Sequence, residues 1–156
     1  SDDEGMKYKL DEVLEHEALL LGRKTYEGFA AAWPGRTDEA GFADKMNSMR
    51  KYVVSTTVSD PEWNNTSVIS SEVDDQVRRL KAEEGGDILV AGSATLVRSL
   101  HQSGLVDEYR LMVFPVVLGS GLRLFPDDAS DKVKLSLASS KAYGNGIILN
   151  TYTRAS

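Results

Sequence analysis

The chain has 156 residues, of which 41% are hydrophobic and 27% charged, as expected for one globular domain. It contains no cysteine, which excludes a disulfide framework, a thiol nucleophile and a thiolate metal site. The formal net charge of -6 and the lack of a basic block argue against a nucleic-acid binder, and no apolar run is long enough to span a bilayer. We therefore expect a cytoplasmic protein that binds neither nucleic acid nor membrane.

The first half of the chain predicts helices that alternate with short strands. Met6, Leu10, Val13 and Leu14 would share one face of an N-terminal helix. The next expected elements are a buried strand over 18–21 that Gly22 closes, a helix over 23–32 that Trp33-Pro34-Gly35 stops, a helix over 39–48, and strands over 51–57 and 66–69.

The second half continues this pattern and then turns to strands alone. Ser71 is expected to cap a helix that Gly85-Gly86 ends. A buried parallel strand over 87–91 should pass through Gly92-Ser93 into a helix that Gly104 closes. The last expected elements are a strand over 106–114, a Gly-rich loop over 115–121, and an antiparallel pair over 133–143 and 147–152 joined at Gly144-Asn145-Gly146.

This order of elements predicts an α/β fold. A mostly parallel central sheet would be flanked by helices and would end in an antiparallel C-terminal edge. Because no linker, internal repeat or low-complexity segment interrupts the chain, residues 1–156 are expected to form a single domain.

The first segment that could bind a ligand lies where a strand ends at Gly22 and a helix begins at once. A helix start offers backbone N–H groups and a positive dipole end, which favour an anion. Arg23 and Lys24 add two cations and Thr25 adds a hydroxyl, so a phosphate is the natural guest. The segment could equally be a solvated helix start with surface cations.

Two further segments point the same way. Hydroxyls of Ser55, Thr56 and Thr57 follow a strand, where open α/β sheets bind ligands, although such residues also suit a plain strand end. Gly92 allows a close approach of a ligand, and the N–H groups from Ser93 to Leu96 can hold a pyrophosphate. The segment does not match G-x-G-x-x-G, and a tight turn that needs glycine for packing is the alternative.

The fourth segment is the Gly-rich loop Pro115-Val116-Val117-Leu118-Gly119-Ser120-Gly121, followed by Leu124-Phe125. It could wrap a ligand with backbone groups or serve only as a turn. In this order and spacing, the four segments and Leu105-Val106-Asp107-Glu108 resemble the dihydrofolate-reductase-like family, which includes the reductase domain of bacterial riboflavin biosynthesis. The resemblance runs from about Ala18 to Tyr152.

The resemblance implies that NADPH binds extended across the carboxyl edge of the sheet. Arg23, Lys24 and Thr25 would meet the adenosine 2′-phosphate, and the hydroxyls after the second strand would line the adenosine site. The residues then expected at the cofactor are Gly22, Arg23, Lys24, Thr25, Ser55, Thr56, Thr57, Gly92, Ser93, Ala94, Thr95 and Leu96. Those expected on the substrate side are Tyr26, Glu27, Pro115, Leu118, Gly119 and Gly121.

The sequence departs from the family at its start. The family opens with a strand and a Ser-Leu-Asp-Gly-like stretch that helps to form the substrate pocket, and this sequence has neither. We expect residues upstream of Ser1 to supply them, and the catalytic residue stays unassigned.

Several conspicuous residues are not expected to act. His16 and His101 lack metal-ligand spacing and are expected at the surface. Trp33 and Trp63 are expected in the core, and the acidic clusters 2–4 and 127–128 are expected to be solvated, so no metal site is predicted.

The leading hypothesis is an NADPH-dependent reductase that transfers a hydride to a small pteridine-, pyrimidine- or carbonyl-type acceptor. The alternatives are a nucleotide-binding module without turnover and a purely structural domain whose glycines serve turns only. We also expect a homodimer, because the resemblance implies one and because the late strands would leave a long edge that needs cover.

Overall fold

The computed structural model describes residues 8, 11–37, 41–83, 85–125 and 132–155. The described residues fall into two compact units, which comprise residues 8–105 and 106–155. Helical residues 11–15 precede the first strand. The elements that follow are β1 His16–Gly22, α2 Arg23–Ala32, α3 Phe42–Ser48, β2 Arg50–Val54, β3 Thr66–Ile69, α4 Val73–Ala82, β4 Asp87–Gly92, α5 Ala94–Gln102, β5 Glu108–Val113, β6 Leu135–Ala142 and β7 Ile148–Arg154.

The 8–105 unit is built on a parallel four-stranded sheet in the order β3-β2-β1-β4. Strand β1 lies in the interior of this sheet, and its residues 18–21 are at most 1% exposed. A strand buried on both faces reads as a continuous apolar run, as the Ala-Leu-Leu-Leu segment does. Because all four strands run in the same direction, their carboxyl ends meet at one edge.

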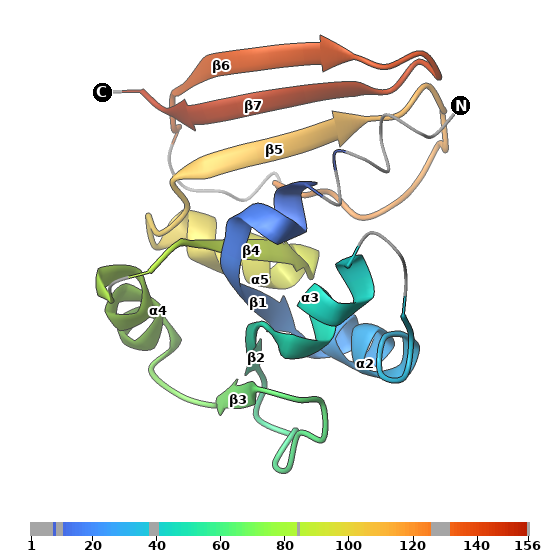
Figure 1. Ribbon diagram of the computed structural model, residues 1–156. Coiled ribbons are helices and arrows are strands. Elements are labelled where there is room, and N and C mark those ends of the chain that lie inside the picture. The colour runs from blue at the N-terminus through green and yellow to red at the C-terminus, as the bar shows by residue number, and fades with distance from the viewer. Residues whose placement is uncertain (1–7, 9–10, 38–40, 84, 126–131, 156) are drawn as a thin grey trace. The chain divides into compact units, whose positions relative to one another are not determined.

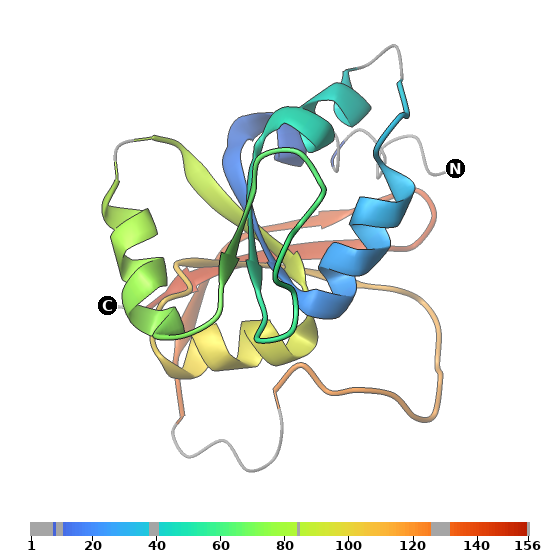
Figure 2. The ribbon, with the colours of Figure 1, turned by 90° about the horizontal axis from the view of Figure 1, so that it is seen from below.

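Helices cover both faces of this sheet (Figures 1 and 2). The chain moves one way from β1 to β2 and the opposite way from β3 to β4, so right-handed crossovers place their helices on opposite faces. Helices α2 and α3 accordingly share one core with β1 and β2, in which Leu19, Leu21, Tyr26, Met46 and Val53 are buried.

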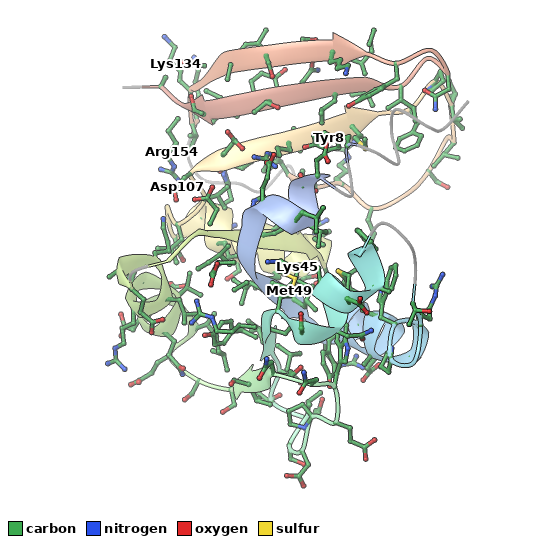
Figure 3. All side chains as sticks on the ribbon, in the orientation of Figure 1. Tyr8, Lys45, Met49, Asp107, Lys134 and Arg154 are labelled. Carbon is green, nitrogen blue, oxygen red and sulfur yellow. The ribbon has the colours of Figure 1, made fainter. Side chains whose placement is uncertain are left out.

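The 106–155 unit is an antiparallel three-stranded sheet in the order β5-β7-β6. The turn at Gly144-Asn145-Gly146 joins β6 to β7, as the sequence predicts, and the Tyr143 and Ile147 backbones pair at 2.8 Å. In the same unit, Nε of Arg154 donates to the Val106 carbonyl at 2.9 Å (Figure 3).

The predicted fold class is confirmed, since a parallel sheet flanked by helices is accompanied by antiparallel strands at the C-terminal end. The antiparallel strands pair with one another in a sheet of their own. Strand β2 is shorter than predicted and ends at Val54, because the Ser55 side chain turns the chain by accepting from two later N–H groups.

Some local predictions are wrong. The residue that caps α4 is Glu72, with φ of 50°, and Ser71 precedes it; the helix ends at Ala82, before the Gly85-Gly86 pair. Strand β4 is half-buried at positions 88–90, although a fully buried strand was predicted, because it lies at one end of the parallel sheet's strand order.

The N-terminal predictions also need correction. His16 is buried at 6% exposure, because it begins the interior strand β1 and its ring pairs with the Glu12 carbonyl. Leu14 is 44% exposed and leaves the apolar face on which Val13 is buried. The expectations for Met6, Leu10 and the acidic clusters 2–4 and 127–128 lie outside the described residues.

The two tryptophans behave as the sequence suggests, with Trp63 buried at 4% exposure and Trp33 packed against the same core. Within the part of the chain that the structure describes, no helix has the length and apolar character needed to cross a membrane.

Candidate functional site

Two strand-to-helix turns meet at the carboxyl edge of the parallel sheet. Strand β1 runs directly into α2 at Arg23, and β4 passes through Ser93 into α5. The two strands are paired, with Leu21 opposite Gly92. The starts of two helices therefore lie next to each other, which concentrates two positive dipole ends at one place.

The two turns are in close contact through residues with little or no side chain. A Cβ added at Gly22 would lie 2.5 Å from Oγ of Ser93, and a Cβ added at Gly92 would lie 2.9 Å from Oγ1 of Thr25. Gly92 also has φ of +148°, a conformation that L side chains rarely adopt, and its peptide bond to Ser93 is cis. We name Gly22, Thr25, Gly92 and Ser93 the turn cluster.

The first turn of α2 is open to an anion. Its N-cap is Gly22, which provides no side-chain acceptor, and no acidic residue stands in the first turn. At the start of α5, the Ser93 hydroxyl accepts from the Leu96 N–H at 3.5 Å, and the N–H groups of Ala94 and Thr95, in the first turn, have no partner inside the helix.

Two cations, Arg23 and Lys24, lie at this edge, and Arg23 is paired with a carboxylate. Nη1 of Arg23 lies 3.1 and 3.2 Å from the two carboxylate oxygens of Glu27, one helical turn further on. Lys24 is exposed. The Arg23–Glu27 pair is itself solvent-exposed, so it holds the guanidinium only weakly and leaves it able to meet a second anion.

The predicted hydroxyl segment adjoins the turn cluster, because β2 pairs with β1 with Val54 opposite Gly22. Ser55 is buried, and its hydroxyl accepts from the N–H groups of Thr57 and Val58 at 3.0 and 3.1 Å. Ser55 therefore shapes the turn, whereas Thr56 and Thr57 are exposed at the edge. All twelve residues predicted at the cofactor belong to the 8–105 unit.

The predicted substrate-side residues are divided between the two units. Tyr26 is buried at 6% exposure and packs near Trp63, with ring centroids 6.3 Å apart, while Glu27 pairs with Arg23. Pro115, Leu118, Gly119 and Gly121 belong to the 106–155 unit, where Leu118 is 80% exposed.

Sequence reasoning missed a buried cation near the start of β2, at the end of the strand away from the turn cluster. Lys51 is 1% exposed, and its Nζ donates to the carbonyls of Met46, Asn47 and Met49 at 2.9 to 3.0 Å and lies 4.3 Å from the centre of the Trp63 ring. Met49, labelled in Figure 3, follows the end of α3.

Burial lowers the pKa of Lys51 from 10.5 to about 8. The sequence did hold one signal for this burial. On a predicted strand, Lys51 and Tyr52 point to opposite faces, and a lysine that faces inward needs hydrogen-bond acceptors for its ammonium group.

No group of three or more acidic or histidine side chains suited to a metal ion occurs among the residues that the structure describes. The chemistry of the site is thus that of backbone N–H groups, hydroxyls and two cations, which suits a phosphorylated ligand.

Residues 2–149 match the family model of the RibD C-terminal domain. The chain belongs to this family. The uncharacterized protein YyaP of Bacillus subtilis (strain 168) is 31% identical over 139 residues, which cover 87% of this chain and 73% of that relative.

Solved structures of low sequence identity share the fold. A protein of Shewanella sp. PV-4 assigned to riboflavin biosynthesis has a TM-score of 0.73 at 19% identity, over 92% of this chain and 77% of its own. A pyrimidine reductase-like protein of Corynebacterium diphtheriae has a TM-score of 0.66 at 14% identity, over 90% and 77% of the two chains.

Proposed function

We propose that the protein is an NADPH-dependent reductase that transfers a hydride to a small pteridine-, pyrimidine- or carbonyl-type acceptor. Membership in the RibD C-terminal domain family supports a reductase-type role that acts on a small molecule. The observation that carries the proposal is the turn cluster. In it, two adjacent helix starts pack closely at Gly22 and Gly92, where a Cβ would collide with the other turn.

The turn cluster suits a pyrophosphate. A dinucleotide needs backbone donors for its phosphate oxygens, and the α2 and α5 starts offer them. Arg23 and Lys24 stand where they could add charge-assisted hydrogen bonds to a further phosphate, which favours NADPH over NADH.

The nicotinamide ring supplies the hydride chemistry when the cofactor is bound. The residues of this chain would bind and orient it: Gly22 and Gly92 let the two turns pack closely, the N–H groups of the first turns donate to its phosphates, and the Ser55 turn fixes the position of Thr56 and Thr57.

The test of cofactor choice is a parallel calorimetric titration with NADPH and NADH. Arg23→Ala should weaken NADPH binding by about three- to tenfold, as expected for a charge-assisted contact at an exposed site, and should leave NADH binding nearly unchanged. Glu27→Gln frees the guanidinium, so it should tighten NADPH binding or leave it unchanged.

Arg78→Ala is a matched control, because Arg78 also forms an exposed ion pair within a helix, with Asp75 on α4 at 3.0 Å. Equal losses for NADPH and NADH in Arg23→Ala, or an equal loss of NADPH binding in Arg78→Ala, would contradict the 2′-phosphate assignment.

A nucleotide-binding module without turnover is the second candidate. It is favoured by one observation: Glu27 is the single carboxylate among the residues assigned to the site in the 8–105 unit, and it is already paired with Arg23. One measurement separates the two functions: the loss of nicotinamide absorbance when the protein and NADPH are mixed with pteridine, pyrimidine or carbonyl acceptors. A protein that binds NADPH and oxidises it with none of them is a binding module.

A further inference from the structure

An open groove of about 760 Å³ lies along α2 in the 8–105 unit, and its lining residues include Tyr26 and Glu27, which were predicted on the substrate side. One wall is the α2 surface that carries Ala30 and Ala31, and the other is the segment between β2 and β3, which carries Val58, Asp60, Glu62 and Trp63. Figure 2 shows this segment and α2 on the same side of the sheet. The described residues that line the groove include none of the twelve assigned to the cofactor.

The groove is held open by a hydrogen-bond network. Asn47 of α3 lies at its centre: its Nδ2 donates to the Trp33 carbonyl at 2.9 Å, and its Oδ1 accepts from Nε1 of Trp63 at 2.7 Å. Nδ2 of Asn64 donates to the Asn47 carbonyl at 3.3 Å. Because these bonds tie α2, α3 and the β2–β3 segment together, the groove is preformed.

The walls of the groove are largely apolar, and two carboxylates lie at its rim. The small side chains of Ala30 and Ala31 leave its α2 wall low, and Val58 and Pro61 extend the apolar area on the opposite wall. Asp60 and Glu62 flank Pro61, and both carboxylates are exposed.

The end of α2 adds to this negative potential. The groove reaches Pro34, which has no backbone N–H and therefore cannot close a helical hydrogen bond to the carbonyl of Ala30. The C-terminal end of a helix carries partial negative charge, so it attracts a cation.

Three cations near the groove are each in contact with another group. Arg23 pairs with Glu27 at 3.1 Å, and Arg36 lies over the Trp33 ring at 4.6 Å. Lys51 is buried next to the Trp63 ring and donates to the carbonyls of Met46 and Asn47 in α3 and of Met49 just after it. The Asp60 and Glu62 carboxylates thus determine which charge the groove accepts.

We propose that this groove binds a small organic cation, an ammonium group on a flat apolar body. Its volume lies within the range of small-molecule sites, roughly 300–1,000 Å³. The apolar body would cover Ala31, Val58 and Pro61, and the ammonium would lie between the Asp60 and Glu62 carboxylates and the end of α2. The same charges disfavour a phosphorylated ligand, and none of the twelve residues assigned to the cofactor lines the groove, so the proposed cation would not compete with the cofactor for those residues.

The test uses phenethylammonium, with phenylacetate as the probe of matched shape and opposite charge, titrated into the whole protein and followed by calorimetry and by two-dimensional NMR. The ammonium should bind at least about tenfold more tightly than the carboxylate, because the rim carboxylates attract one and repel the other. The double variant Asp60→Asn, Glu62→Gln should lose about three- to tenfold in affinity for the ammonium.

Two further variants make the result specific. Glu15→Gln with Asp87→Asn removes one glutamate and one aspartate that are exposed outside the groove, and it should bind the ammonium like the unmodified protein. Ala31→Leu fills the groove with a good helix former at an exposed helical position, so it should abolish binding while the circular dichroism spectrum is unchanged.

Equal binding of the two probes, unchanged affinity in Asp60→Asn, Glu62→Gln, or no saturable binding below about 5 mM would each overturn the proposal. An equal loss of affinity in the Glu15→Gln, Asp87→Asn control would also overturn it, because the attraction would then come from the net charge of the protein.

Discussion

At the scale of single residues, the buried polar side chains that the structure describes form hydrogen bonds with nearby backbone groups, His16 and Lys51 with carbonyls and Ser55 with N–H groups. Lys51 is the clearest case, since its ammonium is buried against three carbonyls at the end of α3 and against the Trp63 ring. An alternating strand pattern suggests that a residue faces inward, but the acceptors come from a helix whose end is set by tertiary packing. This is why the sequence identifies Lys51 as a strand residue and not as a helix cap.

The burial of Lys51 predicts a specific pH dependence of stability. Its pKa falls from 10.5 to about 8 on folding, so between these pH values the unfolded chain holds a proton that the folded chain has released. The free energy of unfolding therefore rises with pH across this window, by an amount on the order of 1–3 kcal/mol relative to Lys51→Met, which has no proton to release. Urea unfolding of both proteins from pH 7 to pH 10.5 measures the difference, and parallel pH profiles would contradict it.

A second residue-scale prediction concerns Gly92. Gly92→Ala combines an unfavourable φ of +148° with a Cβ 2.9 Å from Oγ1 of Thr25, so it should lower stability by about 1–3 kcal/mol and weaken NADPH binding. Thr25→Ala removes the crowded oxygen. In that background Gly92→Ala should cost less in thermal unfolding, and an identical cost would show that the contact with Thr25 plays no part.

At the scale of elements, the sequence predicts best where glycine or proline interrupts the chain. Helix α2 begins and ends as predicted because Gly22 stands directly before it and Pro34 cannot continue it. The adjacency of the two β-α turns was predictable in outline, since parallel strands bring their carboxyl ends to one edge. The groove was not predictable, because its walls come from segments about 30 residues apart that are brought together by the Asn47 network and by the packing of Tyr26 near Trp63.

Helix α4 offers an element-scale prediction. Its N-cap is Glu72 with φ of 50°, a left-handed conformation that a side chain with a Cβ adopts only at a cost. Glu72→Gly should raise the free energy of unfolding by about 0.5–1 kcal/mol. The matched control is Glu83→Gly at the other end of α4, where φ is −68° and glycine should lower stability, so a stability gain in both variants would contradict the explanation.

At the scale of the whole molecule, the net charge of -6 is spread over a chain that still exposes a considerable apolar surface in the 106–155 unit. Val117 is 97% exposed and Leu122 89%, both in the segment that follows β5, and Leu137 on β6 is 59% exposed. Strand β6 stands at one end of the order β5-β7-β6, so its outer edge has no neighbour in that sheet. An exposed apolar strand edge is a template for pairing with another chain.

We therefore predict a homodimer in which a second copy covers this apolar surface. Val117→Glu and Leu137→Lys should each raise the dissociation constant of the dimer by about tenfold or more, because a charge would be buried at the contact. Leu14→Lys changes a leucine that is 44% exposed in the 8–105 unit and should leave the dissociation constant unchanged. Light scattering and sedimentation over a wide concentration range measure the mass. A protein that stays monomeric throughout would refute the dimer, and equal weakening by all three substitutions would place the contact elsewhere on the surface.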